Sequence, residues 1–229
     1  MQQHAIEQII GVSHTHIADY VCPYSATKIP VHHQILQPLQ DLVILAQKDG
    51  VYIQLISGFR SFERQLTIWN SKWAGQREVR DAYSQIIDPL TVDETQRLWL
   101  LLTWSAVPGL SRHHWGTDID IFDAKAISQG HKVTLVPEEF SKKGPCNKLG
   151  DWLNNNLLNT SFFRPYWPHS GKISPEPWHI SFKPLAQGLE SAALKHSPNI
   201  CQHIISQKTA GHSVIKQNFS KILNEYFKV

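Results

Sequence analysis

Apolar residues in the first part of the chain recur at the spacing of a helix that is buried along one side. Ile35 and Leu39 begin a series of apolar residues that follow one another at intervals of one to four between positions 31 and 48. This pattern predicts an amphipathic helix over 31–48, which Gly50 is placed to end. The next segment, 51–59, is predicted to be a buried strand.

Three further helices are predicted before the middle of the chain. Ser61 is placed to cap the first, which runs through Trp73 and has an acidic residue in its first turn, where the helix dipole favours an anion. A second helix is predicted over 77–87. Residues 91–94 form a capping box, which predicts a third, mostly buried helix over 97–104.

Strands are predicted mainly in the second half, where polar and apolar residues alternate. The segment 117–122 alternates aspartate with isoleucine, which predicts a strand with one acidic face. A short strand is predicted over 133–136 and a helix over 149–159. The segment 178–182 alternates again, so it is predicted to be another strand.

From Pro184 the pattern is helical almost to the end of the chain, with breaks near 197–198 and at Gly211. No internal repeat or low-complexity tract interrupts this order. The fold class is therefore predicted to be α+β, with one domain over 1–183 and a helical C-terminal extension over 184–229.

The composition describes a globular protein and excludes several classes of function. The chain has 229 residues, of which 41% are hydrophobic, and its net charge of +3 is too small to indicate a nucleic acid or an anionic membrane as partner. Cys22, Cys146 and Cys201 are far apart and odd in number, which does not describe a disulfide framework. The first residues resemble no secretory signal, and no apolar stretch is long enough to span a bilayer, so we expect a cytoplasmic protein. The oligomeric state is not predicted.

Two polar clusters stand at the edges of predicted strands, and both contain residues that bind metals. The first is SRHHWGTDID, residues 111–120, and the second is EPWH, residues 176–179. A catalytic zinc takes three protein ligands, and two histidines with one carboxylate are a permitted set. His113 and Asp120 are seven positions apart and would face opposite ways on one straight strand. Gly116 supplies a turn that lets both converge.

Alternatives without a metal have to be weighed against this hypothesis. A single His-x-x-Gly-x-Asp is more often structural, with the histidine capping a turn. Asp118 and Asp120 are also consistent with a solvated strand face. The second cluster favours the metal, because His179 offers a third ligand and Glu176, three residues earlier, is placed to act as a general base.

These clusters resemble the motifs of a known family, the zinc D-alanyl-D-alanine carboxypeptidases of the VanY type, a group that includes the VanX dipeptidases and some phage endolysins. The family's Ser-x-His-x-x-Gly-x-Ala-x-Asp appears as SRHHWGTDID and its Glu-x-x-His as EPWH. Its Ser-Gly-Tyr-Arg-Ser appears as SGFRS, residues 57–61. The resemblance covers about 53–182 and implies the α+β zinc peptidase fold that the family shares with the Hedgehog signalling domain.

The resemblance also implies a role for each matching residue. Arg60 would stabilise the tetrahedral oxyanion, although without the other motifs a surface arginine at a helix start would be the preferred interpretation. Ser111 would help to hold the C-terminal carboxylate of the substrate, or it caps a turn. The implied site is as follows: zinc ligands His113, Asp120 and His179, catalytic residues Glu176 and Arg60, and substrate-binding residues Ser111 and Gln65.

Two positions depart from the family pattern. Asp118 stands where alanine is more usual, and this extra carboxylate would orient His113 or His114, or act as a ligand itself. Phe59 replaces the usual tyrosine and removes one hydroxyl that the metal chemistry does not need.

The implied function is a zinc-dependent carboxypeptidase that removes the terminal D-Ala from peptidoglycan stem peptides or their fragments, with a water activated by the metal as nucleophile. A peptidoglycan endopeptidase or an L,D-carboxypeptidase on the same zinc site is the first alternative, and the sequence does not separate it. The second alternative is a binding module that contains zinc without turnover. Glu176 and Arg60 argue against it, because a structural zinc has no use for either.

Overall fold

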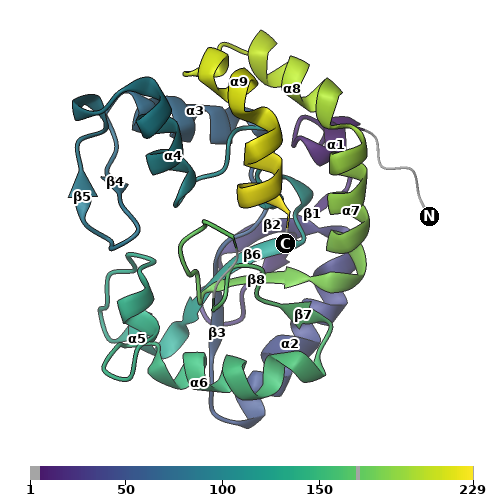
Figure 1. The fold of residues 1–229 in the computed structure, drawn as a ribbon. Helices are drawn as coiled ribbons and strands as arrows, with labels where there is room; N and C mark the ends of the chain where they lie inside the picture. The colour runs from purple at the N-terminus through teal and green to yellow at the C-terminus, as the bar shows by residue number, and fades with distance from the viewer. Residues whose placement is uncertain (1–5, 169–170, 229) are drawn as a thin grey trace.

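The computed structural model describes residues 6–168 and 171–228, and a four-stranded antiparallel sheet lies at its centre (Figure 1). Its strands, in spatial order, are β3 (Ile53–Ser57), β6 (Asp118–Asp123), β8 (His179–Phe182) and β7 (Phe162–Phe163). Two hairpins add the pairs β1 (Ile17–Val21) with β2 (Lys28–His32) and β4 (Val79–Arg80) with β5 (Ile86–Ile87).

Helices lie on both sides of this sheet (Figure 1). The α-helices are α1 (Ile6–Ile9), α2 (Leu36–Lys48), α3 (Phe62–Trp73), α4 (Glu94–Leu102), α5 (Ala124–Ser128), α6 (Asn147–Asn156), α7 (Lys183–Lys195), α8 (Ser197–Ser206) and α9 (His212–Ile222). Short 3-10 turns cover His33–Ile35, Pro89–Thr91, Arg112–Trp115, Pro137–Phe140 and Leu157–Asn159, and a π-helical turn covers Leu223–Phe227.

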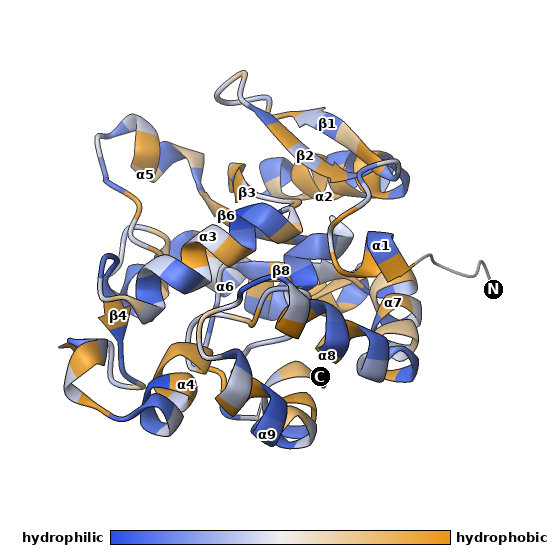
Figure 2. Ribbon diagram, turned by 90° about the horizontal axis from the view of Figure 1, so that it is seen from above, coloured by the Kyte–Doolittle hydropathy of each residue, from blue (hydrophilic) through white to orange (hydrophobic). Residues whose placement is uncertain are grey.

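Two hydrophobic cores hold these layers together. The first lies between the sheet, β1, β2, α2 and α6, and buries residues such as Val43, Ile121 and Trp152. The second joins α1, α3 and α4 to α7, α8 and α9, and buries Trp69 and Ile215 completely. Figure 2 shows α3 and α9 with apolar residues along one part of their surface and polar residues along another.

The C-terminal helices share the second core with the part of the chain that precedes them. The indole Nε1 of Trp69 on α3 donates to the carbonyl oxygen of Ala210 at 3.0 Å. The predicted helical breaks are confirmed, because α7 ends at Lys195 and Gly211 adopts a φ of 70° at the start of α9. The division of the chain into 1–183 and 184–229 stays a prediction.

The predicted α+β class is confirmed, and so are several individual elements. The strand predicted over 51–59 corresponds to β3, and the helix predicted over 149–159 corresponds to α6 with the 3-10 turn behind it. Ser61 caps α3 as expected, since its hydroxyl accepts from the backbone N–H of Arg64 at 3.2 Å.

The helix predicted over 77–87 is wrong, because these residues form the β4–β5 hairpin. The carboxylate of Asp81 accepts the backbone N–H groups of Tyr83 and Gln85 at 2.8 and 2.9 Å. Such local side-chain bonds give the backbone an alternative to the helix. The predicted strand over 133–136 is also absent.

In the segment 133–136, where a strand was predicted, the buried carboxylate of Glu139 accepts the backbone N–H groups of Thr134 and Val136, both at 3.1 Å. These N–H groups are therefore not used in a sheet. The helix predicted over 31–48 begins only at Leu36, because its first residues belong to β2 and a 3-10 turn.

The cap of α4 also lies two residues later than predicted. Asp93, and not Thr91, accepts the backbone N–H of Gln96 at 2.8 Å.

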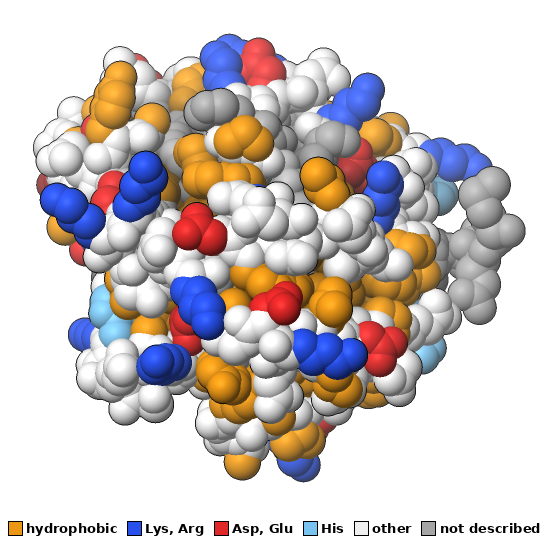
Figure 3. Space-filling view, turned by 90° about the horizontal axis from the view of Figure 1, so that it is seen from below, with side chains coloured by type: hydrophobic (Ala, Val, Ile, Leu, Met, Phe, Trp, Pro, Cys, Tyr) orange, Lys and Arg blue, Asp and Glu red, His pale blue; other side chains and the backbone are white. Residues whose placement is uncertain are grey.

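On the face seen in Figure 3, Lys and Arg side chains are interspersed with Asp and Glu side chains, so charge of one sign does not gather on its described part. None of the helices in the described ranges is long and apolar enough to cross a membrane.

Candidate active site

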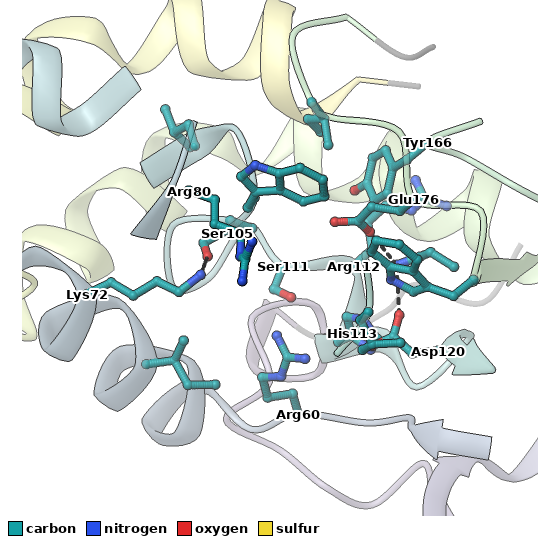
Figure 4. A pocket seen from close by; sticks show the side chains of 18 of the residues that line it. Arg60, Lys72, Arg80, Ser105, Ser111, Arg112, His113, Asp120, Tyr166 and Glu176 are labelled. Carbon is teal, nitrogen blue, oxygen red and sulfur yellow. Dashed lines mark hydrogen bonds and ion pairs between the residues drawn. The ribbon is translucent and has the colours of Figure 1, made fainter. Parts of the chain in front are cut away.

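A cleft of about 340 Å³ contains the residues that the two sequence clusters single out (Figure 4). Its lining includes His113, Asp120, His179, Glu176 and Arg60. These residues come from the 3-10 turn at 112–115, from β6, from the start of β8, and from the loops before β8 and α3. The structure therefore brings together side chains that lie up to 119 positions apart in the chain.

The three predicted metal ligands converge because of the way their strands pair. Asp120 on β6 lies directly opposite His179 on β8. Gly116 ends the turn that carries His113 and adopts a φ of 69°, a conformation that strongly favours glycine. One ligand atom from each of the three residues lies within 4.8 Å of the others, and all three side chains are buried.

Hydrogen bonds fix which nitrogen of each histidine faces this point. The Nδ1 of His113 lies 2.8 Å from the carbonyl oxygen of Gly58, and because a carbonyl only accepts, Nδ1 carries the proton. The Nε2 of His179 lies 3.0 Å from the carboxylate of Asp118, so this nitrogen is the protonated one. When both rings are neutral, the lone pairs of His113 Nε2 and His179 Nδ1 face Asp120.

This arrangement fits a cation better than it fits the side chains alone. His113 Nε2 and His179 Nδ1 each lie 3.4 Å from a carboxylate oxygen of Asp120. The Oδ1 of Asp120 is buried and accepts no hydrogen bond from the described residues, while its Oδ2 accepts only from Ser57, at 2.6 Å. Acceptors that converge in a buried place without donors between them repel one another unless a positive ion joins them.

The pKa shifts of His179 and Asp120 also indicate that positive charge is favoured at this point. Burial alone lowers the pKa of His179, but Asp118, Asp120 and Glu176 outweigh it and raise this pKa well above its usual value. Burial alone raises the pKa of Asp120, but His113 and His179 outweigh it and hold this pKa well below its usual value. The carboxylate is thus kept ionised.

Asp118 is buried and holds the ring of His179 by a hydrogen bond, and this corrects two expectations. It is fully buried and Asp120 is 5% exposed, so these aspartates do not form a solvated strand face. Asp118 accepts a hydrogen bond from His179, and not from His113 or His114. Its carboxylate also accepts from Arg112 Nε at 2.8 Å, from Ser181 Oγ at 2.9 Å and from Thr117 Oγ1 at 2.8 Å.

Glu176 lies beside the cluster at the edge of the cleft. Its Oε2 is 3.2 Å from His179 Nδ1, and its side chain is 15% exposed. The backbone holds it there, since the N–H of Glu176 donates to the carbonyl oxygen of Tyr166 at 2.9 Å and the N–H of His179 donates to the carbonyl oxygen of Glu176 at 3.1 Å. The ring of Tyr166 packs edge-on against that of His179, with centroids 4.9 Å apart.

Arg60 is held in the cleft wall from two sides, unlike a surface arginine at a helix start. Its backbone N–H donates to the carbonyl oxygen of His113 at 3.0 Å, and the Nδ1 of His114 donates to the carbonyl oxygen of Arg60 at 2.7 Å. Burial lowers the pKa of His114 to about 3, so this histidine stays neutral. Its Nε2 accepts the N–H of Gly109 at 3.0 Å, which leaves no nitrogen for a metal.

Gln65 lies behind Arg60 and outside the lining of the cleft. Arg60 Nη1 donates to its Oε1 at 2.9 Å, and its Nε2 donates to the carbonyl oxygen of Ala106 at 2.7 Å. The side chain is 1% exposed. These contacts favour a role in positioning Arg60 over the predicted contact with substrate.

Ser111 lines the cleft, and its hydroxyl does not cap the 3-10 turn that follows it. This removes the expectation that Ser111 is a turn cap and leaves its hydroxyl facing the cleft (Figure 4). Its role in substrate binding stays a prediction.

Other residues of the lining have no counterpart in the sequence clusters. Lys72 is one of them, and helical spacing offers a signal for it, because Gln65, Ile68 and Lys72 are three and four positions apart on α3. Ser105 and Tyr226 carry no such signal, since tertiary packing alone brings them to the cleft.

Comparison with known proteins gives a consistent result. The model of the family "VanY: D-alanyl-D-alanine carboxypeptidase" matches residues 28–185. A D-alanyl-D-alanine carboxypeptidase of Enterococcus faecalis is 30% identical over 166 residues, which are 71% of this chain and 50% of that protein. An uncharacterized protein of Haemophilus influenzae is 35% identical over 127 residues, which are 54% of this chain and 95% of that protein.

Two solved structures are also similar. A mutant of the vancomycin resistance D,D-pentapeptidase VanY in complex with Zn(II) has a TM-score of 0.47 and 28% identity, over 73% of this chain and 79% of that one. VanYB in complex with D-Alanine-D-Alanine has a TM-score of 0.49 and 26% identity, over 78% of this chain and 84% of that one.

Proposed function

Since this chain belongs to the VanY family of D-alanyl-D-alanine carboxypeptidases, we propose that it is a zinc-dependent enzyme that removes the terminal D-Ala from peptidoglycan stem peptides or their fragments. The observation that carries the proposal is the convergence of His113 Nε2, Asp120 and His179 Nδ1 on one buried point, beside Glu176 and in the same cleft as Arg60.

The proposed metal ligands are His113, Asp120 and His179. A zinc ion held by them supplies Lewis acidity, which acidifies water and polarises the scissile carbonyl group. We expect the protein purified without added metal to contain one zinc per chain by elemental analysis. His179→Ala should lose the metal, and a variant that keeps full occupancy would contradict the ligand assignment.

Glu176 is proposed to move the protons of the reaction. Its carboxylate lies at the edge of the cluster, where it can take a proton from the attacking water and deliver it to the leaving amine. Its side chain lines the cleft, where water and a peptide can reach it.

Arg60 is proposed to stabilise the negative charge that develops on the carbonyl oxygen. Contacts to His113 and His114 fix its backbone and the hydrogen bond to Gln65 holds its guanidinium, so little rearrangement is needed when that charge appears. Gln65 is proposed to hold this guanidinium, and Ser111 to donate a hydrogen bond to the substrate.

The alternative that keeps the zinc and changes the bond is an endopeptidase or an L,D-carboxypeptidase. The experiment is a comparison of one stem peptide that ends in D-Ala-D-Ala with its C-terminal amide and with a form that ends in a single D-Ala, with products identified by mass spectrometry. A carboxypeptidase of the proposed type cleaves the first far faster than its amide and does not cleave the form that ends in a single D-Ala. Equal cleavage of the acid and the amide would favour the endopeptidase, and no cleavage of any would favour a binding module.

A further inference from the structure

The cations that line the cleft differ in whether a carboxylate neutralises them. Arg80 pairs with Glu78 at 2.6 Å. Arg112 pairs with Asp118 at 2.8 Å and with Glu190 on α7 at 2.7 Å. Arg60 and Lys72 also line the cleft, but neither forms a salt bridge with a carboxylate in the described ranges. These two charges are thus available to a ligand.

Lys72 is held in one position although it has no counter-ion. Its Nζ donates to the hydroxyl oxygen of Ser105 at 2.6 Å, and this is the one hydrogen bond that its ammonium makes with described residues. Burial lowers the pKa of Lys72 to about 8, an effect that Glu176 opposes. An ammonium that has lost water and still has two free donors is stabilised by an anion that enters the cleft.

The position of Lys72 distinguishes it from Arg60. Arg60 lies near the proposed metal ligands, where the carboxylates of Asp120 and Glu176 stabilise its positive charge. Figure 4 shows Lys72 and Ser105 on the side of the cleft opposite to Asp120 and Glu176, with Arg60 and Ser111 between them. A C-terminal peptide presents two negative groups in hydrolysis: the oxyanion, which forms at the scissile carbonyl, and the carboxylate, which is one residue further along the substrate.

We propose that Lys72, steadied by Ser105, pairs with the free C-terminal carboxylate of the peptide and so determines that the enzyme is an exopeptidase. The proposal rests on the proposed function, since it allots Arg60 to the oxyanion. Ser111 is neutral, and its hydroxyl alone does not balance a desolvated carboxylate. Lys72 is the remaining cation of the lining without an acidic partner, among the residues that the structure describes.

The first test compares the acid and the amide of one stem peptide as substrates of Lys72→Met and Lys72→Arg. A hydrogen bond between charged groups contributes about 10- to 150-fold, so Lys72→Met should lower kcat/KM for the acid by that factor. It should change kcat/KM for the amide, already a poor substrate, by less than about threefold. Lys72→Arg keeps the charge and should retain most of the preference for the acid, and Lys48→Met, at the exposed end of α2, is the control.

The pH dependence gives a readout that a structural role for Lys72 does not predict. Because its pKa is lowered to about 8, the charge is present below that pH and is lost above it. The charged groups that act on Lys72 are Glu176, Arg60, Arg77 and Glu78. We expect the KM for the acid to rise above about pH 8 in the native enzyme and to stay level there in Lys72→Arg.

A binding measurement separates this proposal from the proposed function. N-acetyl-D-alanyl-D-alanine is titrated calorimetrically into the zinc-free protein and into zinc-free Lys72→Met, each checked for folding by circular dichroism. The native protein should bind the dipeptide about 10-fold or more tightly than the variant does, even if it hydrolyses nothing. Equal affinities, or equal losses of kcat/KM on acid and amide, would overturn the role of Lys72 while leaving the peptidase assignment intact.

Discussion

Replacing Asp118 by asparagine tests how the protein prepares His179 for a metal. The carboxylate accepts four hydrogen bonds, from Arg112, His179, Thr117 and Ser181, at 2.8 to 3.0 Å. Asparagine has nearly the same shape, but it offers one carbonyl oxygen that accepts hydrogen bonds and one NH2 group that only donates them. The substitution removes the charge that fixes the proton on His179 Nε2.

Two effects of Asp118→Asn follow, and their magnitudes differ. Losing the outer partner of a metal-binding histidine typically lowers metal affinity about 10- to 100-fold, which is about 1.4 to 2.7 kcal/mol. Removing one partner of a buried ion pair costs about 3 to 5 kcal/mol of folding stability. Arg112 keeps Glu190, 2.7 Å away, as a second counter-ion, so we expect a loss of about 3 kcal/mol, the lower end of that range.

The assay measures the two effects separately. Zinc affinity is obtained by competition with a chromophoric chelator, and stability by urea unfolding with the metal removed by EDTA. Asp151→Asn, an exposed position on α6, is the matched control and should change neither quantity. If Asp118→Asn is destabilised but binds zinc within threefold of the native protein, Asp118 serves Arg112 only, and the reasoning about the proton on His179 is refuted.

Three further substitutions have distinct expected outcomes. Glu176→Gln should retain zinc in elemental analysis but lower turnover about 10²- to 10⁴-fold, and loss of the metal would instead make Glu176 a ligand. Arg60→Ala should lower kcat about 10²- to 10³-fold with a smaller change in KM, whereas a change in KM alone would place Arg60 at the carboxylate. Gly116→Ala should cost at least about 1 to 2 kcal/mol in urea unfolding, because φ is 69° there and a Cβ would lie 2.7 Å from the backbone nitrogen of His32. Unchanged stability in that variant would show that the turn relaxes easily.

The convergence of the proposed metal ligands could be predicted because it depends on local features. A histidine, a glycine turn and an aspartate lie within eight residues, and the turn at Gly116 behaves as the sequence indicates. His179 follows from the pairing of two predicted strands. The alternation of Asp118 with Ile119, however, does not tell whether the polar face meets water or a buried arginine. That difference depends on Arg112 and on helices far along the chain.

The errors in the fold have a related cause. Apolar residues over 79–87 recur at the spacing of a helix, but the side chain of Asp81 accepts two backbone N–H groups and decides in favour of a hairpin. The β1–β2 hairpin has no predicted counterpart, since its strands are five residues long and β2 contains Pro30, which is unfavourable in most strands. Short elements of this kind depend on packing against the rest of the protein more than on their own pattern.

The C-terminal helices show most clearly why local sequence patterns predict only part of the site. Glu190 on α7 pairs with Arg112, Arg112 pairs with Asp118, and Asp118 holds the Nε2 of His179. Each link is a buried, charge-assisted contact, so the loss of one partner leaves the next charge without compensation. The orientation of one predicted metal ligand therefore depends on a helix that lies outside the motifs from which the ligand was recognised. Helices α7, α8 and α9 also share the second core with α3, and hence they help to hold the helix that carries Gln65 and Lys72.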